Sequence, residues 1–200
     1  MSTDLEHSIE VAFCAGDFRA ATERAVQGYG PEVMSFLLAL LRDEDEAADV
    51  FSNFCENLWE GIRTFRRDSS FRTWVYAIAR NAHSHYVQEG YRRKRRALSD
   101  FPGLERIEAD IRTRTLTFLR TETKTAIQRL RETLSPDEQT LLILRVDRRL
   151  SWTEIAEILR NVEEPRTEAS LKRVSQSCRK RFERTKEKLR AMARREGLLG

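Results

Sequence analysis

The sequence has few cysteines and no long apolar run, and each absence argues against a class of protein. The three cysteines, Cys14, Cys55 and Cys178, are far apart, odd in number and form no Cys-x-x-Cys pair. This spacing argues against a disulfide framework and a zinc site, so we expect three small buried hydrophobic side chains. No segment approaches the roughly 18 apolar residues of a membrane span, and no charged segment precedes an apolar one as in a signal peptide. We therefore expect a cytoplasmic protein that does not contact a membrane.

The chain also lacks a pattern of catalytic or metal-binding residues. The acidic cluster Asp43 to Glu46 is consecutive at a predicted helix start, and no separated set of carboxylates or histidines converges with it in the sequence. His83 and His85 are two residues apart, which on a helix points them about 200° away from each other. We expect no cofactor, no metal site and no enzymatic activity. A metal-dependent nuclease that uses the acidic cluster is the weakest interpretation of the sequence.

Charge is distributed unevenly along the chain, although the formal net charge is only +4. Residues 1–60 hold 3 basic and 13 acidic side chains, whereas residues 61–97 hold 10 basic and 2 acidic ones. A second basic block, residues 166–195, holds 12 basic and 3 acidic side chains. Two basic blocks joined by a spacer suggest two contacts with one polyanion, which would raise avidity. The acidic N-terminal block suggests a protein partner.

The first basic block interleaves arginines with aromatic residues between Phe65 and Arg96. Arginine binds phosphate, and an exposed aromatic ring stacks on an unpaired base with about 1 to 3 kcal/mol. A helical projection from Phe71 places one apolar face opposite a polar face that carries Arg72, Tyr76 and Arg80. This pattern favours contact with partly melted DNA, although an ordinary amphipathic helix with a charged solvent face would show a similar stripe.

The remaining pattern predicts an all-α chain with two small helical domains. We expect helices over residues 4–41, interrupted at Gly16 and at Gly28 to Pro31, and over Ala47–Trp59, with an apolar stripe and an opposite polar face. Ser135-Pro136-Asp137-Glu138 and Ser151-Trp152-Thr153-Glu154 are capping patterns that predict two further helix starts. Pro102 and Gly103 predict a linker over residues 97–115, with a short helix near Leu104–Ile111.

Three of these segments carry a family resemblance. Asp45–Trp59 (DEAADVFSNFCENLW), Phe65–Asn81 and Leu134–Leu159 resemble, in the same order, the two domains of bacterial RNA polymerase sigma factors of the small extracytoplasmic-function (ECF) type. The resemblance implies a region 2-like domain at 1–96, a linker at 97–115 and a region 4-like helix-turn-helix domain at 116–200. It implies core RNA polymerase and promoter DNA as partners, and an anti-sigma factor is a further candidate partner.

The resemblance also assigns roles to particular residues. The helix with the polar face would bind core polymerase through Asp49, Ser52, Asn53, Glu56 and Asn57, although the family commonly has longer polar side chains at Ser52 and Asn53. The following loop would capture a flipped base and the next helix would bind the melted strand of the first promoter element, through Arg66, Arg67, Asp68, Ser69, Ser70, Phe71, Arg72, Tyr76, Arg80 and Asn81.

The DNA-recognition helix has two possible registers, because residues 160–167 replace the short turn that the family usually has. An early start near Glu168 would present Lys172, Arg173 and Gln176 to the major groove. A later start, which matches the family pattern better, would present Ser177, Arg179, Lys180, Arg181 and Arg184. In both cases we expect one long helix through Arg195. The alternative function is a helix-turn-helix regulator that binds duplex DNA without polymerase.

Overall fold

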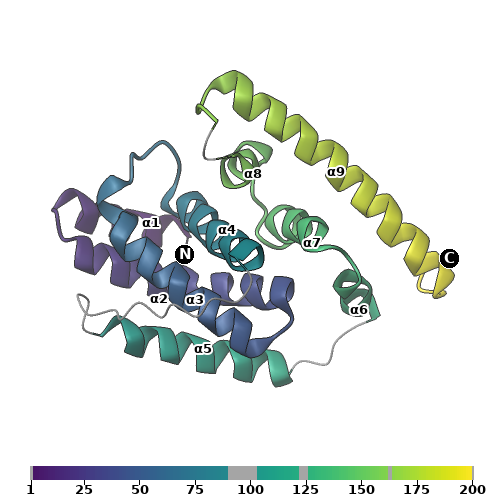
Figure 1. The fold of residues 1–200 in the computed structure, drawn as a ribbon, viewed down its shortest axis with the longest axis horizontal. Coiled ribbons are helices and arrows are strands. Elements are labelled where there is room, and N and C mark those ends of the chain that lie inside the picture. The colour runs from purple at the N-terminus through teal and green to yellow at the C-terminus, as the bar shows by residue number, and fades with distance from the viewer. Residues whose placement is uncertain (1, 90–102, 122–125, 162–163, 200) are drawn as a thin grey trace. The chain divides into compact units, whose positions relative to one another are not determined.

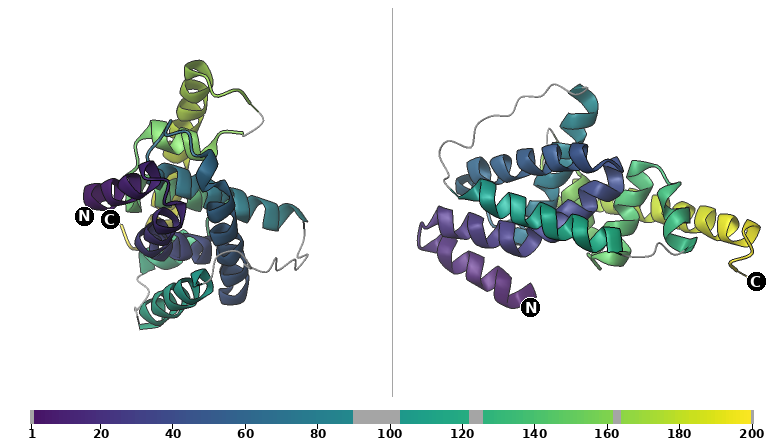
Figure 2. Two further views of the ribbon diagram at one scale, coloured as in Figure 1. Left: turned by 90° about the vertical axis from the view of Figure 1, so that its left-hand side faces the viewer. Right: turned by 90° about the horizontal axis from the view of Figure 1, so that it is seen from below.

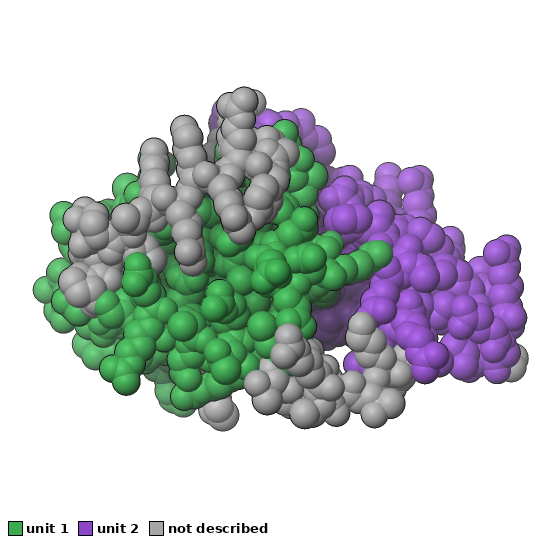
Figure 3. Space-filling view, turned by 60° about the horizontal axis from the view of Figure 1, so that its bottom comes forward, with its two compact units in different colours: residues 1–119 green, residues 120–200 purple. Residues whose placement is uncertain are grey.

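The computed structural model describes residues 2–89, 103–121, 126–161 and 164–199, in which helices are joined by short loops and no strand is present, as the sequence predicts (Figure 1). The chain separates into two compact units, residues 1–119 (unit 1) and residues 120–200 (unit 2), coloured separately in Figure 3. Unit 1 contains α1 (Ser2–Cys14), α2 (Phe18–Leu41), α3 (Glu44–Gly61), the 3₁₀ helix η1 (Ile62–Thr64), α4 (Phe71–Glu89) and most of α5 (Leu104–Thr121). Unit 2 contains α6 (Ala126–Glu132), α7 (Pro136–Leu142), the π-helix η2 (Ile143–Asp147), α8 (Trp152–Leu159) and α9 (Glu168–Arg195).

Helix α2 is continuous through Gly28 and Pro31, so the interruption that the sequence predicted there is wrong. The two glycines instead allow other helices to come close. A Cβ atom on Gly28 would lie 2.3 Å from Cδ2 of Leu5 on α1, and one on Gly30 would lie 2.6 Å from Cδ1 of Ile111 on α5. Close packing on both sides outweighs the poor helix propensity of these residues.

Helix α3 packs as its sequence predicts, but it begins at Glu44 rather than at Ala47. The Asp43 side chain accepts hydrogen bonds from the backbone N–H groups of Asp45 and Glu46, which caps the helix where negative charge is favourable. The apolar stripe is fully buried, with no accessible surface on Val50, Phe51, Phe54, Cys55 and Leu58. The opposite face carries the polar side chains, which keep part of their surface accessible.

Residues 104–115 form part of α5, which is longer than the short helix expected within the linker. Its residues Leu104, Glu108, Ile111 and Thr115 are buried and recur at helical spacing. They form one face, and Figures 1 and 2 both show α5 running beside α3. This part of the expected linker is therefore packed structure, and residues 97–102 lie outside the described ranges.

Helices α7 and α8 begin at the predicted caps, Ser135 and Ser151, and α9 begins at a cap that the sequence analysis did not identify, Thr167. Ser135, Ser151 and Thr167 each accept a hydrogen bond from the backbone N–H three residues later, and each forms a reciprocal capping box. The π-helix η2 follows α7 directly. The N–H of Arg148, the residue after η2, donates to the carbonyl of Ile143 at 2.9 Å. Ile143 is buried in this wider turn, whereas Val146 is 51% exposed although its side chain is apolar.

The cysteines divide between core and surface. Cys55 and Cys178 are buried, as expected, and burial raises the pKa of each thiol. Cys14, the last residue of α1, is exposed, so its predicted burial is wrong. Among the helices of the described ranges, none combines the length and hydropathy needed to cross a membrane.

Candidate nucleic-acid and polymerase interfaces

The 66–70 loop (Arg66–Ser70) is bounded by aromatic rings. The Phe65 ring lies 4.2 Å from that of Phe71, centroid to centroid, and 5.0 Å from that of Trp74. Phe65 and Phe71 are buried, whereas Trp74 is half-buried against them. The rings therefore fix both ends of the loop. Phe71 is part of this packing rather than an exposed lining of a pocket, which corrects the expectation for that residue.

The N-terminus of α4 is capped by two side chains. Ser70 Oγ accepts from the Thr73 N–H at 3.1 Å, which is a local cap of the kind that serine commonly provides. Glu6 on α1 accepts from the Phe71 N–H through Oε2 at 3.0 Å and from the Arg72 N–H through Oε1 at 2.8 Å. The carboxylate thus satisfies the first two N–H groups of the helix, where its negative charge is favoured.

Glu32 on α2 connects α4 to the bundle. Its Oε2 accepts from Arg72 Nη2 at 2.8 Å and from the Tyr76 hydroxyl at 3.0 Å. Tyr76 has no accessible surface, and its ring packs edge-to-face on Phe36 at 5.7 Å. The expected exposure of Tyr76 on a ligand face is therefore wrong. Arg72, with 21% of its side chain exposed, is also engaged inside unit 1 rather than presented to solvent.

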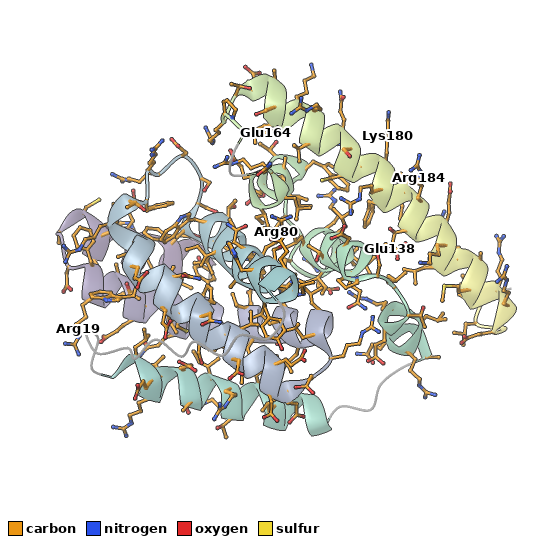
Figure 4. The ribbon with its side chains drawn as sticks, in the orientation of Figure 1. Arg19, Arg80, Glu138, Glu164, Lys180 and Arg184 are labelled. Carbon is orange, nitrogen blue, oxygen red and sulfur yellow. The ribbon has the colours of Figure 1, made fainter. Side chains whose placement is uncertain are left out.

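The polar groups that unit 1 does present here are fewer than the sequence suggests. Arg66, Asp68 and Ser70 are exposed and Ser69 is partly exposed. Arg67 adopts a positive φ of 62° and forms an ion pair with Glu10 of α1. Arg80 and Asn81 are partly exposed on α4, and Arg80 is labelled in Figure 4. The cations between Arg92 and Arg96 lie outside the described residues.

The polar face of α3 is partly covered. Asn57 is exposed, and Asp49, Ser52, Asn53 and Glu56 are intermediate. Ser52 Oγ donates a hydrogen bond to Oε1 of Glu108 on α5. Only 9% of the surface of Glu108 is accessible, so α5 covers this face at least at Ser52, and Figure 2 shows α5 beside α3. The candidate docking surface is therefore shared between the exposed part of α3 and the neighbouring helix.

In unit 2 the long helix α9 packs against α7 and α8 through Cys178 and Phe182, and the ring of Phe182 meets that of Trp152 at 5.4 Å. The whole of α9 is one helix from Glu168 to Arg195, as predicted. Both proposed registers therefore lie on the same element.

The candidate recognition residues separate by what they contact. Lys172, Gln176, Lys180 and Arg184 recur every four residues and are exposed, and Figure 4 shows Lys180 and Arg184 pointing away from α7 and α8. Ser177 is also exposed. Three arginines have partners within unit 2: Arg173 pairs with Glu164 at 2.5 Å, Arg181 pairs with Asp137 at 2.8 Å, and the Arg179 guanidinium lies 5.8 Å from the Trp152 ring centroid.

The described part of the extended turn is attached at both ends. Glu157 of α8 pairs with Arg166 at 2.5 Å and with Arg160 at 3.6 Å. Glu164 pairs with Arg173 of α9. Because the side chain of Glu157 is only 11% exposed, its two ion pairs are better shielded from water than ordinary surface pairs. The turn is thus fixed beside the first turns of α9.

Sequence reasoning missed three carboxylates that organise unit 1, namely Glu6, Glu32 and Glu108. Each forms a hydrogen bond with a residue that is distant in sequence. Glu32 and Tyr76 are 44 residues apart, Glu108 and Ser52 are 56 apart, and Glu6 and Arg72 are 66 apart. The spacing of Glu6 and Glu10 by four residues indicates one acidic face of α1, but it does not identify the partner. A local pattern therefore signals the surface and not its contact.

Two comparisons with known proteins bear on these surfaces. Residues 25–97 match the family model Sigma-70 region 2. The match includes part of α2, all of α3, the 66–70 loop and α4. It ends before α5 and does not extend to unit 2.

Curated relatives match over a longer part of the chain. RNA polymerase sigma-H factor of Pseudomonas aeruginosa is 29% identical over 149 residues, which cover 72% of this chain and 77% of the relative. RNA polymerase sigma factor YlaC of Bacillus subtilis is 28% identical over 141 residues, which cover 70% of this chain and 80% of the relative. The chain is similar to sigma factors over most of its length.

Proposed function

We propose that this protein is a sigma factor of the ECF type, which binds core RNA polymerase and directs initiation at specific promoters. The observation that carries the proposal is the match to sigma-70 region 2 over residues 25–97, which takes in both the polar face of α3 and the 66–70 loop with α4. The similarity to two proteins named as sigma factors over about 70% of the chain supports it.

The proposed polymerase-docking surface is the polar face of α3. Asp49, Asn53, Glu56 and Asn57 retain accessible surface there, opposite the buried stripe that anchors the helix. A rigid helix fixed by its apolar side is a suitable docking element, because little conformational freedom is lost on binding. Ser52 is partly exposed, and its hydroxyl proton is engaged by Glu108 of α5.

The proposed site for the opened promoter strand is the 66–70 loop with the exposed part of α4. Arg66 and Arg80 supply positive charge for phosphate, and Asp68, Ser69 and Ser70 supply polar groups within reach of a flipped base. Arg72 and Tyr76 contribute by fixing α4 to α2 through Glu32. The proposed site is therefore smaller than the sequence alone suggests.

The proposed duplex-reading element is α9 in a region 4-like helix-turn-helix formed with α8. Helix α9 presents Lys172, Gln176, Lys180 and Arg184 as one exposed stripe, and such a helix fits the major groove of B-DNA. Well-oriented bidentate contacts to bases each contribute about 1 to 3 kcal/mol of discrimination. The stripe includes residues from both registers, so both halves of α9 remain candidates for the part that contacts bases. The role makes and breaks no covalent bond.

The proposal is tested by measuring binding of the labelled, purified chain to bacterial core RNA polymerase, followed by transcription from a promoter library. We expect tight binding and start sites that share two spaced upstream motifs. A folded chain that binds specific duplex DNA but not core polymerase would contradict the proposal and establish the polymerase-independent regulator. Adding an excess of a second sigma factor provides the control, because it should compete for core polymerase.

A further inference from the structure

The N-terminal helix α1 contacts the 66–70 loop before, within and after it. Glu6, Glu10 and Phe13 lie on one face of α1, because they are spaced by four and three residues. Glu10 pairs with Arg67 inside the loop. The Phe13 ring packs edge-to-face on Phe65 at 5.8 Å and on Phe71 at 5.6 Å.

Glu6 makes the most demanding of these contacts. Its two oxygens accept the N–H groups of Phe71 and Arg72, and Oε1 also accepts the Tyr29 hydroxyl at 2.6 Å. Burial, and then the hydrogen bond to this carboxylate, raise the pKa of Tyr29, so its hydroxyl remains a donor. A carboxylate therefore occupies the start of α4, where an anionic ligand would otherwise be favoured.

The Glu6 carboxylate at the N-terminus of α4 limits which groups of unit 1 can bind a DNA phosphate. A phosphate is not expected at the N-terminus of α4, because Glu6 already satisfies its first two N–H groups and would repel a second anion. Phosphate contacts are left to cations such as the exposed Arg66 and the partly exposed Arg80. The loop is thus oriented by α1 before any ligand arrives.

Contacts other than those of Glu6 also hold α1 against the rest of unit 1. Ile9 of α1 is fully buried, and Leu5 packs over Gly28 of α2. Arg24 of α2 donates to the carbonyl of Ser8 at 2.6 Å. Changing Glu6 should therefore disturb the 66–70 loop while α1 stays in place.

We propose that α1 is a positioning element of the strand-binding site, in which Glu6 fixes the 66–70 loop in the shape that receives an unpaired base. This inference rests on the proposed sigma function. Glu6 acts through the backbone of Phe71 and Arg72, and it need not contact DNA. A loop ordered in advance loses less freedom on binding, so the carboxylate should strengthen strand capture without affecting polymerase docking on α3.

The test compares Glu6→Gln with Glu23→Gln, a matched control that removes a carboxylate from the Arg19–Glu23 pair on α2. The probe is a labelled single-stranded oligonucleotide carrying the downstream motif found in the transcription experiment, added to the complex with core polymerase. We expect Glu6→Gln to weaken strand binding by about tenfold, which corresponds to loss of a hydrogen bond to a charged group. Core polymerase affinity should stay within about twofold, and the control should match wild type.

Hydrogen exchange supplies a local readout. The amides of Phe71 and Arg72 should exchange faster in Glu6→Gln, while those in the middle of α3 should keep their protection. If Glu6→Gln fails to fold, Glu10→Gln replaces it, because Glu10 is exposed and its loss cannot remove a core contact. That variant should lower the ratio of affinities for matched and mismatched oligonucleotides, since Arg67 loses its partner.

The outcomes separate the inference from the function on which it rests. Wild-type strand affinity in a Glu6→Gln variant with faster exchange at Phe71 would overturn the inference alone. Proportional losses of strand and polymerase binding would also overturn it, because Glu6 would then only stabilise the fold. A wild-type chain that does not bind core polymerase would overturn the proposed function itself.

Discussion

Replacing Tyr76 with phenylalanine should reduce the stability of unit 1 without weakening strand binding. The sequence pattern placed Tyr76 among DNA contacts, whereas the structure buries it completely and directs its hydroxyl to Glu32 at 3.0 Å. Tyr76→Phe keeps the ring contact with Phe36 and removes only this hydrogen bond. The variant therefore distinguishes an internal role for the hydroxyl from a role in binding DNA.

The expected loss follows from the geometry around Glu32. A hydrogen bond to a charged group contributes about 1.5 to 3 kcal/mol. Because Glu32 keeps its ion pair with Arg72 and is 32% exposed, water and Arg72 compensate in part. We therefore expect the free energy of unfolding to fall by about 1.5 kcal/mol, or roughly 5 °C in the melting temperature of a domain of this size.

The assay combines urea unfolding with strand binding to the polymerase complex, measured well below the melting temperature. Arg80→Gln is the reciprocal variant, because Arg80 is partly exposed on α4 and is a proposed phosphate contact. It should weaken strand binding while changing the free energy of unfolding by less than about 0.5 kcal/mol. Unchanged stability together with weaker strand binding in Tyr76→Phe would refute the internal role of the hydroxyl.

Four further variants test other parts of the structure. Glu108→Ala removes the α5 side chain that binds Ser52 and should raise the affinity for core polymerase, measured by titration, about threefold to tenfold. Unchanged or weaker binding would mean that α5 does not compete with polymerase for the polar face of α3. Lys180→Ala should lower the slope of log affinity for duplex DNA against log salt by about 1, whereas Arg181→Ala, whose side chain pairs with Asp137, should leave that slope unchanged. Burial alone would raise the pKa of Glu138, but hydrogen bonds from Lys188 and the Ser135 N–H lower this pKa below its ordinary value. The ionised carboxylate therefore stabilises unit 2 above the ordinary pKa of a glutamate, and this contribution is lost as pH falls through the lowered pKa. Lys188→Ala should move acid unfolding of unit 2 to higher pH, and a carboxyl titration of Glu138 by NMR that shows no change would contradict this.

Local rules made much of the fold predictable. The caps at Asp43, Ser135 and Ser151 depend on side chains within three residues of the helix start. The buried stripe of α3 follows from apolar spacing, which one helix carries by itself. The length of α9 likewise follows from a sustained helical period without a proline. None of these features requires knowledge of a distant segment.

The sequence alone determined the helical class, most helix starts, the buried face of α3 and the residues that resemble a sigma factor. Only the tertiary structure decided which side of α4 is open, because α4 packs against α1, α2 and α3, and a helical projection assumes a single partner. Tyr76 became a core residue and Arg72 an internal ion pair for that reason. Glu6 and Glu108 acquired their contacts in the same way, since a carboxylate finds a helix N-terminus or a serine more than 50 residues away only when packing brings the two together.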